Sequence, residues 1–202
     1  MTQTSEEKIL QAAMDEFAEF GYSGGRIDRI AERADINKAM IYYHFKGKEA
    51  LYTRILKDTT GEIYNYIVSN LPDNEDPLVV INGIASLFIE HLYTVDLKFI
   101  QIMLREISSG GKYMKDVILP NATLPIISIF TDAVAKAKAG GRIKDIHPLY
   151  TFFQLFGSVV LFNAFRIILQ GTDIHKALFG EGFISEYRKN LLLILNEGIV
   201  KT

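Results

Sequence analysis

The chain contains 202 residues, of which 49% are hydrophobic and 23% are charged. This length can bury a core without disulfide bonds, and the apolar content excludes general disorder. The absence of cysteine excludes disulfide scaffolds, Cys-ligated metal sites and thiol nucleophiles. A formal net charge of −2 indicates that any surface for a polyanion is local. The polar, acidic first residues lack the pattern of a signal peptide, so we expect a cytoplasmic protein.

Helical periodicity predicts the elements of the N-terminal part. In the first segment, apolar residues recur at three- and four-residue steps: Ile9, Leu10, Ala13, Phe17 and Phe20. Thr4 or Ser5 is suited to cap this helix, and Gly21 is suited to end it. Two short helices follow, at residues 27–34 and 38–45. A long helix is predicted over residues 48–70, and the prolines at positions 72 and 77 end it.

The rest of the chain predicts about five more helices, at residues 78–93, 97–108, 113–139, 148–170 and 183–200. The third of these is expected to break or kink near Pro120 and Pro125, because each proline removes a backbone donor. Residues 149–165 carry no charge, but 17 residues are short for a membrane-spanning helix. We therefore expect this segment to be a helix buried inside protein, with no membrane partner. No strand pattern occurs, and the predicted fold class is all-α.

Charge is distributed unevenly at the N-terminus. Residues 1–19 hold one basic residue and five acidic ones, whereas residues 20–57 hold eight basic residues and four acidic ones. The second stretch coincides with the two short helices and the start of the long one. A solvated helical surface is the alternative interpretation of such a stretch, so the neighbouring motif decides between them.

Residues 26–48 fit a helix-turn-helix, in which the second helix enters the major groove of DNA. Small apolar residues allow the two helices to pack closely: Ile30, Ala31 and Ala34. Asp35 stands where the turn needs a left-handed backbone, and Asn37 is suited to cap the second helix. That helix points Ile41 and Phe45 inward. Its other side chains are expected at the surface: Lys38, Tyr42, Tyr43 and His44.

These residues resemble the N-terminal module of the tetracycline-repressor (TetR) family over about residues 6–56. The resemblance is carried by three segments: the triplet Phe20-Gly21-Tyr22, the pair Ile30-Ala31 and the run Ile41-Tyr42-Tyr43-His44-Phe45-Lys46-Gly47-Lys48-Glu49-Ala50-Leu51. Two departures stand out. The sequence Gly24-Gly25-Arg26 replaces the usual Thr or Ser before the first helix of the motif, and Asp35 replaces the usual turn glycine.

The resemblance implies a helix-turn-helix DNA-binding domain at residues 1–47 and a helical ligand-binding and dimerisation domain at residues 48–202. Side chains implied in DNA binding are Arg26, Asn37, Lys38, Ala39, Tyr42, Tyr43, His44 and Lys48. Among these, Tyr42, His44 and Lys48 occupy positions that typically contact phosphates. Lys38 and Ala39 lie where base edges are read, and Tyr43 suits either task.

The second domain is expected to sense a small molecule. Candidate lining residues are Phe88, His91, Leu92, Phe99, Met103, Tyr113 and Phe130, with plain core packing as the alternative for each. Their composition predicts a hydrophobic or aromatic effector with few polar groups.

The last two long helices are too apolar for surface helices, and the resemblance implies that they pair with those of a second copy. The expected interface residues are Phe152, Phe156, Val159, Val160, Asn163, Ile167, Tyr187, Leu191, Ile194 and Leu195. Gly157 is expected to allow close approach, and Asn163 to fix the register.

The sequence therefore predicts a dimeric, ligand-responsive transcriptional regulator, most simply a repressor, that binds double-stranded operator DNA. Two alternatives stay open: a DNA-bound regulator without a small-molecule effector, and a helical ligand carrier or enzyme with a non-functional DNA module. No P-loop, nucleophile elbow or dinucleotide motif is present, so we expect no enzyme and no cofactor. His91, His147 and His175 show no metal-ligand spacing, so we also expect no metal.

Overall fold

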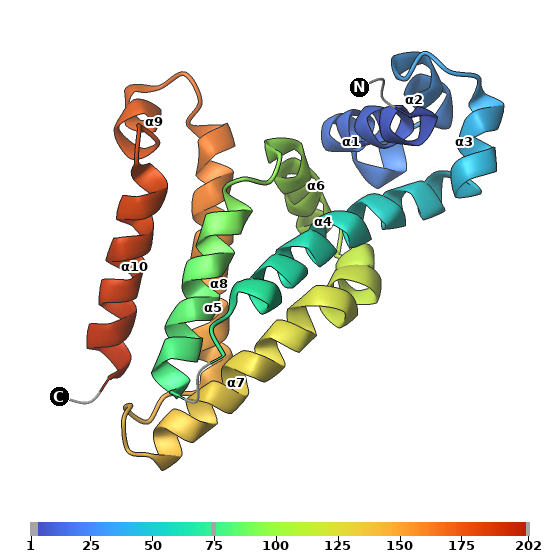
Figure 1. The fold of residues 1–202 in the computed structure, drawn as a ribbon. Helices are drawn as coiled ribbons and strands as arrows, with labels where there is room; N and C mark the ends of the chain where they lie inside the picture. The colour runs from blue at the N-terminus through green and yellow to red at the C-terminus, as the bar shows by residue number, and fades with distance from the viewer. Residues whose placement is uncertain (1–3, 74–75, 201–202) are drawn as a thin grey trace. The chain divides into compact units, whose positions relative to one another are not determined.

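A computed structural model describes residues 4–73 and 76–200, and within these ranges the chain is helical (Figure 1). The elements are α1 (Ser5–Gly24), α2 (Ile27–Arg33), α3 (Lys38–Phe45), α4 (Lys48–Asn70), α5 (Pro77–Leu92), α6 (Leu97–Ser108), the π-helix η1 (Met114–Thr123), α7 (Leu124–Ala139), α8 (Pro148–Ile168), α9 (Asp173–Leu178) and α10 (Phe183–Ile199). The described residues contain no strand, and Ile143 and Val200 form one isolated antiparallel bridge. The predicted all-α class is confirmed.

The chain divides into two compact units. Unit 1 comprises Met1–Gly61 and Asp96–Asn121, and unit 2 comprises Glu62–Val95 and Ala122–Thr202. Residues 96–121, which hold α6 and most of η1, thus belong with the N-terminal helices.

Local sequence explains where α1 begins and bends. Thr4 and Glu7 form a capping box, in which each side chain accepts a hydrogen bond from the other residue's backbone amide. At Gly21 the backbone leaves the helical region (φ 67°, ψ 179°), a conformation that glycine adopts without steric cost. The predicted cap at Thr4 is confirmed. Gly21 is the site of a kink, and the helix is assigned as far as Gly24.

Unit 1 has an aromatic core that joins α1, α4 and the segment after α6. The rings of Tyr22, Tyr52 and Tyr113 lie 4.8 to 5.1 Å apart, centroid to centroid. The Tyr52 hydroxyl donates to the buried Glu106 carboxylate at 2.9 Å, and the Tyr113 backbone amide donates to the same carboxylate at 3.2 Å. Burial raises the pKa of the Tyr52 phenol far above its usual value, so the phenol stays a donor.

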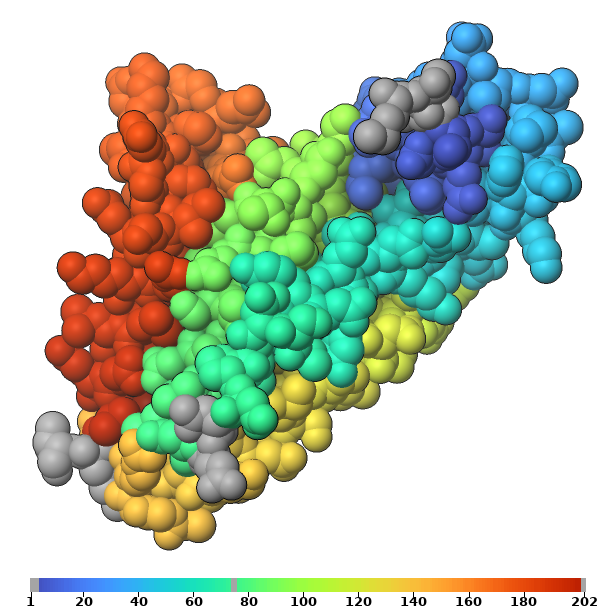
Figure 2. All heavy atoms as spheres, in the orientation of Figure 1, coloured from blue at the N-terminus to red at the C-terminus, as the bar shows by residue number. Residues whose placement is uncertain are grey.

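In unit 2, α5 packs against α7, α8 and α10. Figure 2 shows the side chains of α10 lying against those of α5 on one face of this unit. Aromatic rings of α7 and α8 fill the interior, with Phe130, Phe152 and Phe156 in mutual contact and Phe88 of α5 against Phe156. The fully buried Asn163 amide donates to the Leu92 backbone oxygen at the C-terminal end of α5.

Most predicted helix bounds are confirmed within two residues, and two details differ. The break near Pro120 and Pro125 is a π-helix that contains Pro120, followed by α7 with Pro125 in its first turn. The short helix α9 was not predicted, although Thr172 caps it by accepting from the His175 amide.

The apolar segment at residues 149–165 belongs to a helix of 21 residues, α8. By length and composition, the helical stretches Met114–Ala139 and Pro148–Ile168 are apolar enough to cross a membrane. The expectation that α8 is buried inside protein therefore applies to one of its faces only. The absence of a membrane partner stays a prediction.

Candidate nucleic-acid interface

The predicted helix-turn-helix lies in unit 1 as α2, a short turn and α3. Asp35 has a positive φ of 51°, the left-handed conformation that the turn needs. The Asn37 side chain accepts a hydrogen bond from the Ala39 amide at 2.8 Å and so caps α3. Ile30 of α2 and Ile41 of α3 are fully buried. The turn and the cap predicted from sequence are both observed.

A buried carboxylate joins α1 to α2. The Glu16 side chain is fully buried, accepts from the Arg26 backbone amide at 2.9 Å and pairs with the Arg29 guanidinium at 2.5 Å. Arg33 lies 3.5 Å from its second oxygen. Burial alone would raise the pKa of Glu16, but these hydrogen bonds and positive charges outweigh burial and lower it. Glu16 therefore stays ionised and positions the first helix of the motif.

The same contact explains the missing Thr or Ser before α2. Arg26 stands at the N-cap without a side-chain cap, and the Glu16 carboxylate binds its amide instead. Gly25 lies so close to Phe17 that a Cβ would come within 2.7 Å of the ring. The φ of −66° at Gly25 is open to any residue, so the backbone conformation does not require glycine. Glycine is needed there for space.

Four of the predicted DNA-binding residues form an exposed face of α3: Lys38, Ala39, Tyr42 and Tyr43. The tyrosines are 50% and 80% exposed, which is unusual for large aromatic side chains and leaves both rings free for a partner. Lys38 Nζ lies 2.5 Å from the Asp28 carboxylate on α2. Asp28 is therefore part of this face, although the sequence analysis did not select it.

Three other residues predicted to contact DNA, which are Lys48, His44 and Arg26, lie outside this exposed face of α3. Lys48 Nζ donates to the backbone oxygens of Tyr22 and Gly25 at 2.8 and 3.2 Å and lies over the Tyr22 ring, so its charge stabilises the end of α1. His44 is half-buried, and its Nε2 atom is buried without a hydrogen-bond partner in the part of the chain that the structure describes. Arg26 is exposed, and it is its backbone amide that Glu16 binds. At Lys48, the backbone amides that begin α4 are better placed than its ammonium group to meet a phosphate.

Comparison with known proteins identifies this geometry. The family model described as "Bacterial regulatory proteins, tetR family" matches residues 9–55. The Escherichia coli HTH-type transcriptional regulator RutR is 26% identical over 194 residues, which cover 95% of this chain and 88% of RutR. Over residues 9–55 the chain therefore matches the tetR family of bacterial regulatory proteins, and its similarity to RutR extends over nearly its whole length.

The chain is also similar to a second regulator in sequence and to a solved structure in fold. The Staphylococcus epidermidis negative regulator of the biofilm operon, IcaR, is 29% identical over 112 residues; these cover 55% of this chain and 58% of IcaR, less than two thirds of its length. The crystal structure of Bacillus subtilis FadR in complex with stearoyl-CoA shares the fold, with a TM-score of 0.72 at 17% identity over 95% of this chain and 97% of FadR. TetR-family proteins are DNA-binding regulators, and the all-α architecture fits them.

The predicted ligand-lining residues are divided between the two units. Phe99, Met103 and Tyr113 belong to unit 1, whereas Phe88, His91, Leu92 and Phe130 belong to unit 2. In unit 2, Phe88 and Phe130 pack on other aromatic rings, and His91 stacks on Tyr66 with centroids 4.6 Å apart. Core packing, the alternative at each position, describes Phe88 and Phe130.

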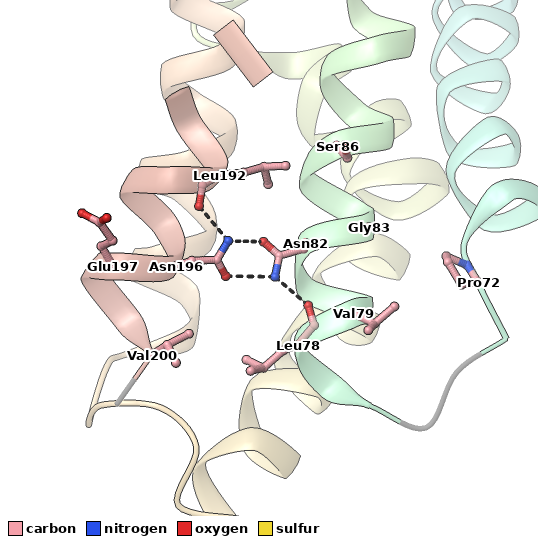
Figure 3. A pocket seen from close by; sticks show the side chains of 10 residues that line it. All are labelled: Pro72, Leu78, Val79, Asn82, Gly83, Ser86, Leu192, Asn196, Glu197 and Val200. Atoms are coloured by element: carbon pink, nitrogen blue, oxygen red, sulfur yellow. Dashed lines mark hydrogen bonds between the residues drawn. The ribbon is translucent and has the colours of Figure 1, made fainter. Parts of the chain in front are cut away.

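An open groove of about 1040 Å³ lies in unit 2 between α5 and α10 (Figure 3). The amides of Asn82 and Asn196 face each other across it and exchange two hydrogen bonds, at 2.9 and 3.0 Å. Each amide nitrogen also donates to a carbonyl of its own helix, at Leu78 and Leu192. Both amide nitrogens are thus occupied, and the pair joins the two helices.

The predicted dimer residues mostly face the interior of their own chain. Phe152, Phe156, Val159, Asn163, Leu191 and Leu195 are buried, and Val160, Ile167 and Tyr187 are half-buried; Ile194 is 64% exposed. The apolar stripe that α8 exposes lies on another face: Tyr150, Phe153, Gly157, Leu161, Phe165 and Ile168. A helix that is apolar on both faces hides this distinction from sequence periodicity.

Among the residues that the structure describes, no group of three or more His, Asp or Glu side chains could hold a metal ion. The three histidines considered in the sequence take part in ring contacts: His91 with Tyr66, His147 with Tyr150, and His175 with Phe179.

Proposed function

We propose that this protein is a dimeric transcriptional repressor that binds a palindromic operator and is released by a small, mostly apolar effector. In this proposal residues 1–47 read DNA, and residues 48–202 bind the effector and dimerise. The observation that carries the proposal is the exposed face of α3, where Lys38, Tyr42 and Tyr43 stand on a scaffold fixed by Glu16. The relatives support repression, because IcaR is named a negative transcriptional regulator. A cytoplasmic location follows, since operator DNA is there.

Dimerisation through the exposed stripe of α8 supports the same function. A palindromic operator presents two half-sites about 34–36 Å apart, or a multiple of one helical turn, and each needs its own recognition helix. The stripe places large apolar side chains on the surface around Gly157, where a Cβ would meet nothing within 4 Å. An apolar surface of this kind on a TetR-family helix is suited to a second copy.

An effector would act by its different affinity for the DNA-binding and the released state. FadR of Bacillus subtilis, which shares this fold, has been crystallised with stearoyl-CoA, so the fold can hold a long acyl group. One observation favours a second candidate function, a regulator without an effector. The rings of Phe88, Phe130 and Phe156 fill the interior of unit 2 by packing on each other.

Selection of bound duplexes from a random pool tests DNA recognition directly. We expect a palindrome whose half-site spacing matches two recognition helices. On that duplex, Tyr42→Ala, Tyr43→Ala and Lys38→Ala are each expected to weaken binding about tenfold, because each removes a phosphate or base contact. Lys57→Ala, an exposed lysine of α4 outside the motif, is the matched control. Unchanged affinity in all three α3 variants would contradict the proposed DNA reading.

A further inference from the structure

Arg166, in the last turn of α8, carries a charge that no carboxylate of the described residues balances. Its Nη1 atom donates to the Asn163 side chain at 3.0 Å and to the Tyr93 backbone oxygen at 3.3 Å. Within residues 4–73 and 76–200, its Nε and Nη2 atoms meet no hydrogen-bond acceptor, and no Asp or Glu pairs with it. Burial lowers the pKa of this guanidinium, and the side chain is still reachable from solvent because it is only half-buried.

The carboxylate of Glu90, in the last turn of α5, is already paired, because it binds Arg188 of α10. In unit 1, by contrast, the buried charge of Glu16 is balanced by two arginines. A partly desolvated cation without an anion costs free energy, so a half-buried, unpaired guanidinium is suited to bind an anion.

A second unsatisfied group lies in the same place. Tyr93 is 5% exposed, and its hydroxyl is buried without a hydrogen-bond partner among the described residues. The Arg166 guanidinium lies 5.6 Å from the centre of the Tyr93 ring. A buried hydroxyl that donates to nothing is uncommon in folded proteins and calls for an explanation.

Aromatic rings surround these two polar groups. Phe183 lies 5.2 Å from Tyr93 and 5.6 Å from the guanidinium. Tyr187, 5.9 Å from Tyr93, stacks on Phe162 with centroids 4.3 Å apart. Phe162, Phe183 and Tyr187 are all half-buried, so part of each ring remains open to a ligand. These elements, α8, α10 and the end of α5, all belong to unit 2 (Figure 1).

We propose that Arg166 and Tyr93 bind the carboxylate of a small amphipathic acid whose apolar body packs on these rings. The Nε and Nη2 atoms form the planar fork of a guanidinium that binds both oxygens of a carboxylate. The Tyr93 hydroxyl donates a further hydrogen bond to one of them. Such a ligand supplies the missing anion and satisfies the orphaned hydroxyl at once. The inference rests on the proposed effector response, and it gives the effector a charged head group that the sequence analysis did not foresee.

The test compares acids with the alcohols of the same skeleton. The full chain, free of DNA, is titrated in a calorimeter with octanoate and 1-octanol, and with 4-phenylbutyrate and 4-phenyl-1-butanol. We expect at least one acid to bind about tenfold more tightly than its alcohol, because only the acid engages the guanidinium fork. Tyr93→Phe and Arg166→Lys are each expected to reduce that preference severalfold and to leave the affinity for the alcohol unchanged.

Tyr64→Phe, which removes a phenol hydroxyl of α4 outside this cluster, is the control and keeps the preference. Tyr93→Phe also serves as a folding control, because removal of an unsatisfied hydroxyl is expected to keep or raise the melting temperature. The proposal is overturned if neither acid is preferred by the unaltered chain, or if Tyr93→Phe keeps the full preference. The second result would leave Arg166 as a cap for the carbonyl end of α5 only. Operator binding is measured separately, so loss of the acid preference with intact DNA binding refutes this inference alone.

Discussion

The lysine that is proposed to read a base, Lys38, is also the one that an acidic neighbour restrains. Lys38 Nζ lies 2.5 Å from Asp28, and both side chains are exposed, at 46% and 72%. The pair raises the pKa of Lys38, which stays charged at neutral pH in any case. Its main consequence is electrostatic: Asp28 sets the position of Lys38 and adds a negative charge to a face that has to approach phosphates.

We predict that Asp28→Asn strengthens DNA binding and weakens discrimination. Removal of one negative charge from the face is expected to raise the affinity for a scrambled duplex by about two- to tenfold at low salt. The operator gains less, because Lys38 loses its restraint. Titrations of both duplexes at two salt concentrations measure the effect. Asp58→Asn, which removes one of the two acidic partners of Arg54 on α4, makes the same change in charge outside the face. Equal behaviour of the two variants would refute the role given to Asp28.

Single residues of the motif were predictable where the cause is local. The left-handed turn at Asp35 and the cap at Asn37 depend on neighbours within a few positions, and both are observed. The environment of Lys48 was not predictable. Its acceptors, the carbonyls of Tyr22 and Gly25, lie 26 and 23 positions earlier in the chain. The sequence shows that a lysine is present, but not that its ammonium group binds the carbonyls at the end of another helix.

At the scale of elements, one carboxylate ties α1 to the helix-turn-helix. We predict that Glu16→Gln destabilises unit 1 by about 1–3 kcal/mol at pH 7, because two arginines lose their shared anion. Urea unfolding followed by circular dichroism measures this. Glu19→Gln is the control, since Glu19 pairs with Arg33 at the surface and a solvated pair contributes little.

The effect of Glu16→Gln on the free energy of unfolding should depend on pH, and the direction of this dependence follows from the pKa of Glu16. The folded state lowers the pKa of Glu16, so its stabilising contribution is fully present above the unfolded pKa of about 4.3. The contribution is lost as the pH falls through the lower folded value. The stability difference between the unaltered chain and Glu16→Gln should therefore be largest at neutral pH and shrink in acid. A difference that is constant from pH 7 to pH 3 would show that Glu16 acts by packing alone.

Helix positions were more predictable than helix faces. Caps, glycines and prolines mark the ends of helices in the sequence, and the observed bounds follow them closely. The face that each helix buries depends on its neighbours. In α8, Phe152 and Phe156 point inward while Phe153 and Leu161 point outward. All four residues are apolar, so the sequence does not distinguish the two faces. Only the packing of Phe130 and Phe88 decides which phenylalanines are in the core.

At the scale of the whole molecule, the grouping of residues 96–121 with the N-terminal helices could not be foreseen. One of the contacts that support it, between Tyr52 and Glu106, joins residues 54 positions apart. Because Tyr113 binds the same carboxylate through its backbone amide, α6 and the segment before η1 share one buried polar centre with α4. A substitution in this segment is therefore expected to affect the DNA-binding helices of unit 1 first.

The exposed stripe of α8 gives the last prediction. If two copies pair through it, Leu161→Glu places a charge in the middle of an apolar interface and should convert the dimer to a monomer. Operator affinity should then fall by at least about a hundredfold, because the two recognition helices no longer bind as one molecule. Leu124→Glu, at an equally exposed leucine of α7, should leave both properties unchanged. Analytical ultracentrifugation and operator titration report the two effects independently. A Leu161→Glu variant that stays dimeric would move the interface to another surface, whereas one that becomes monomeric but keeps full operator affinity would separate DNA recognition from dimerisation.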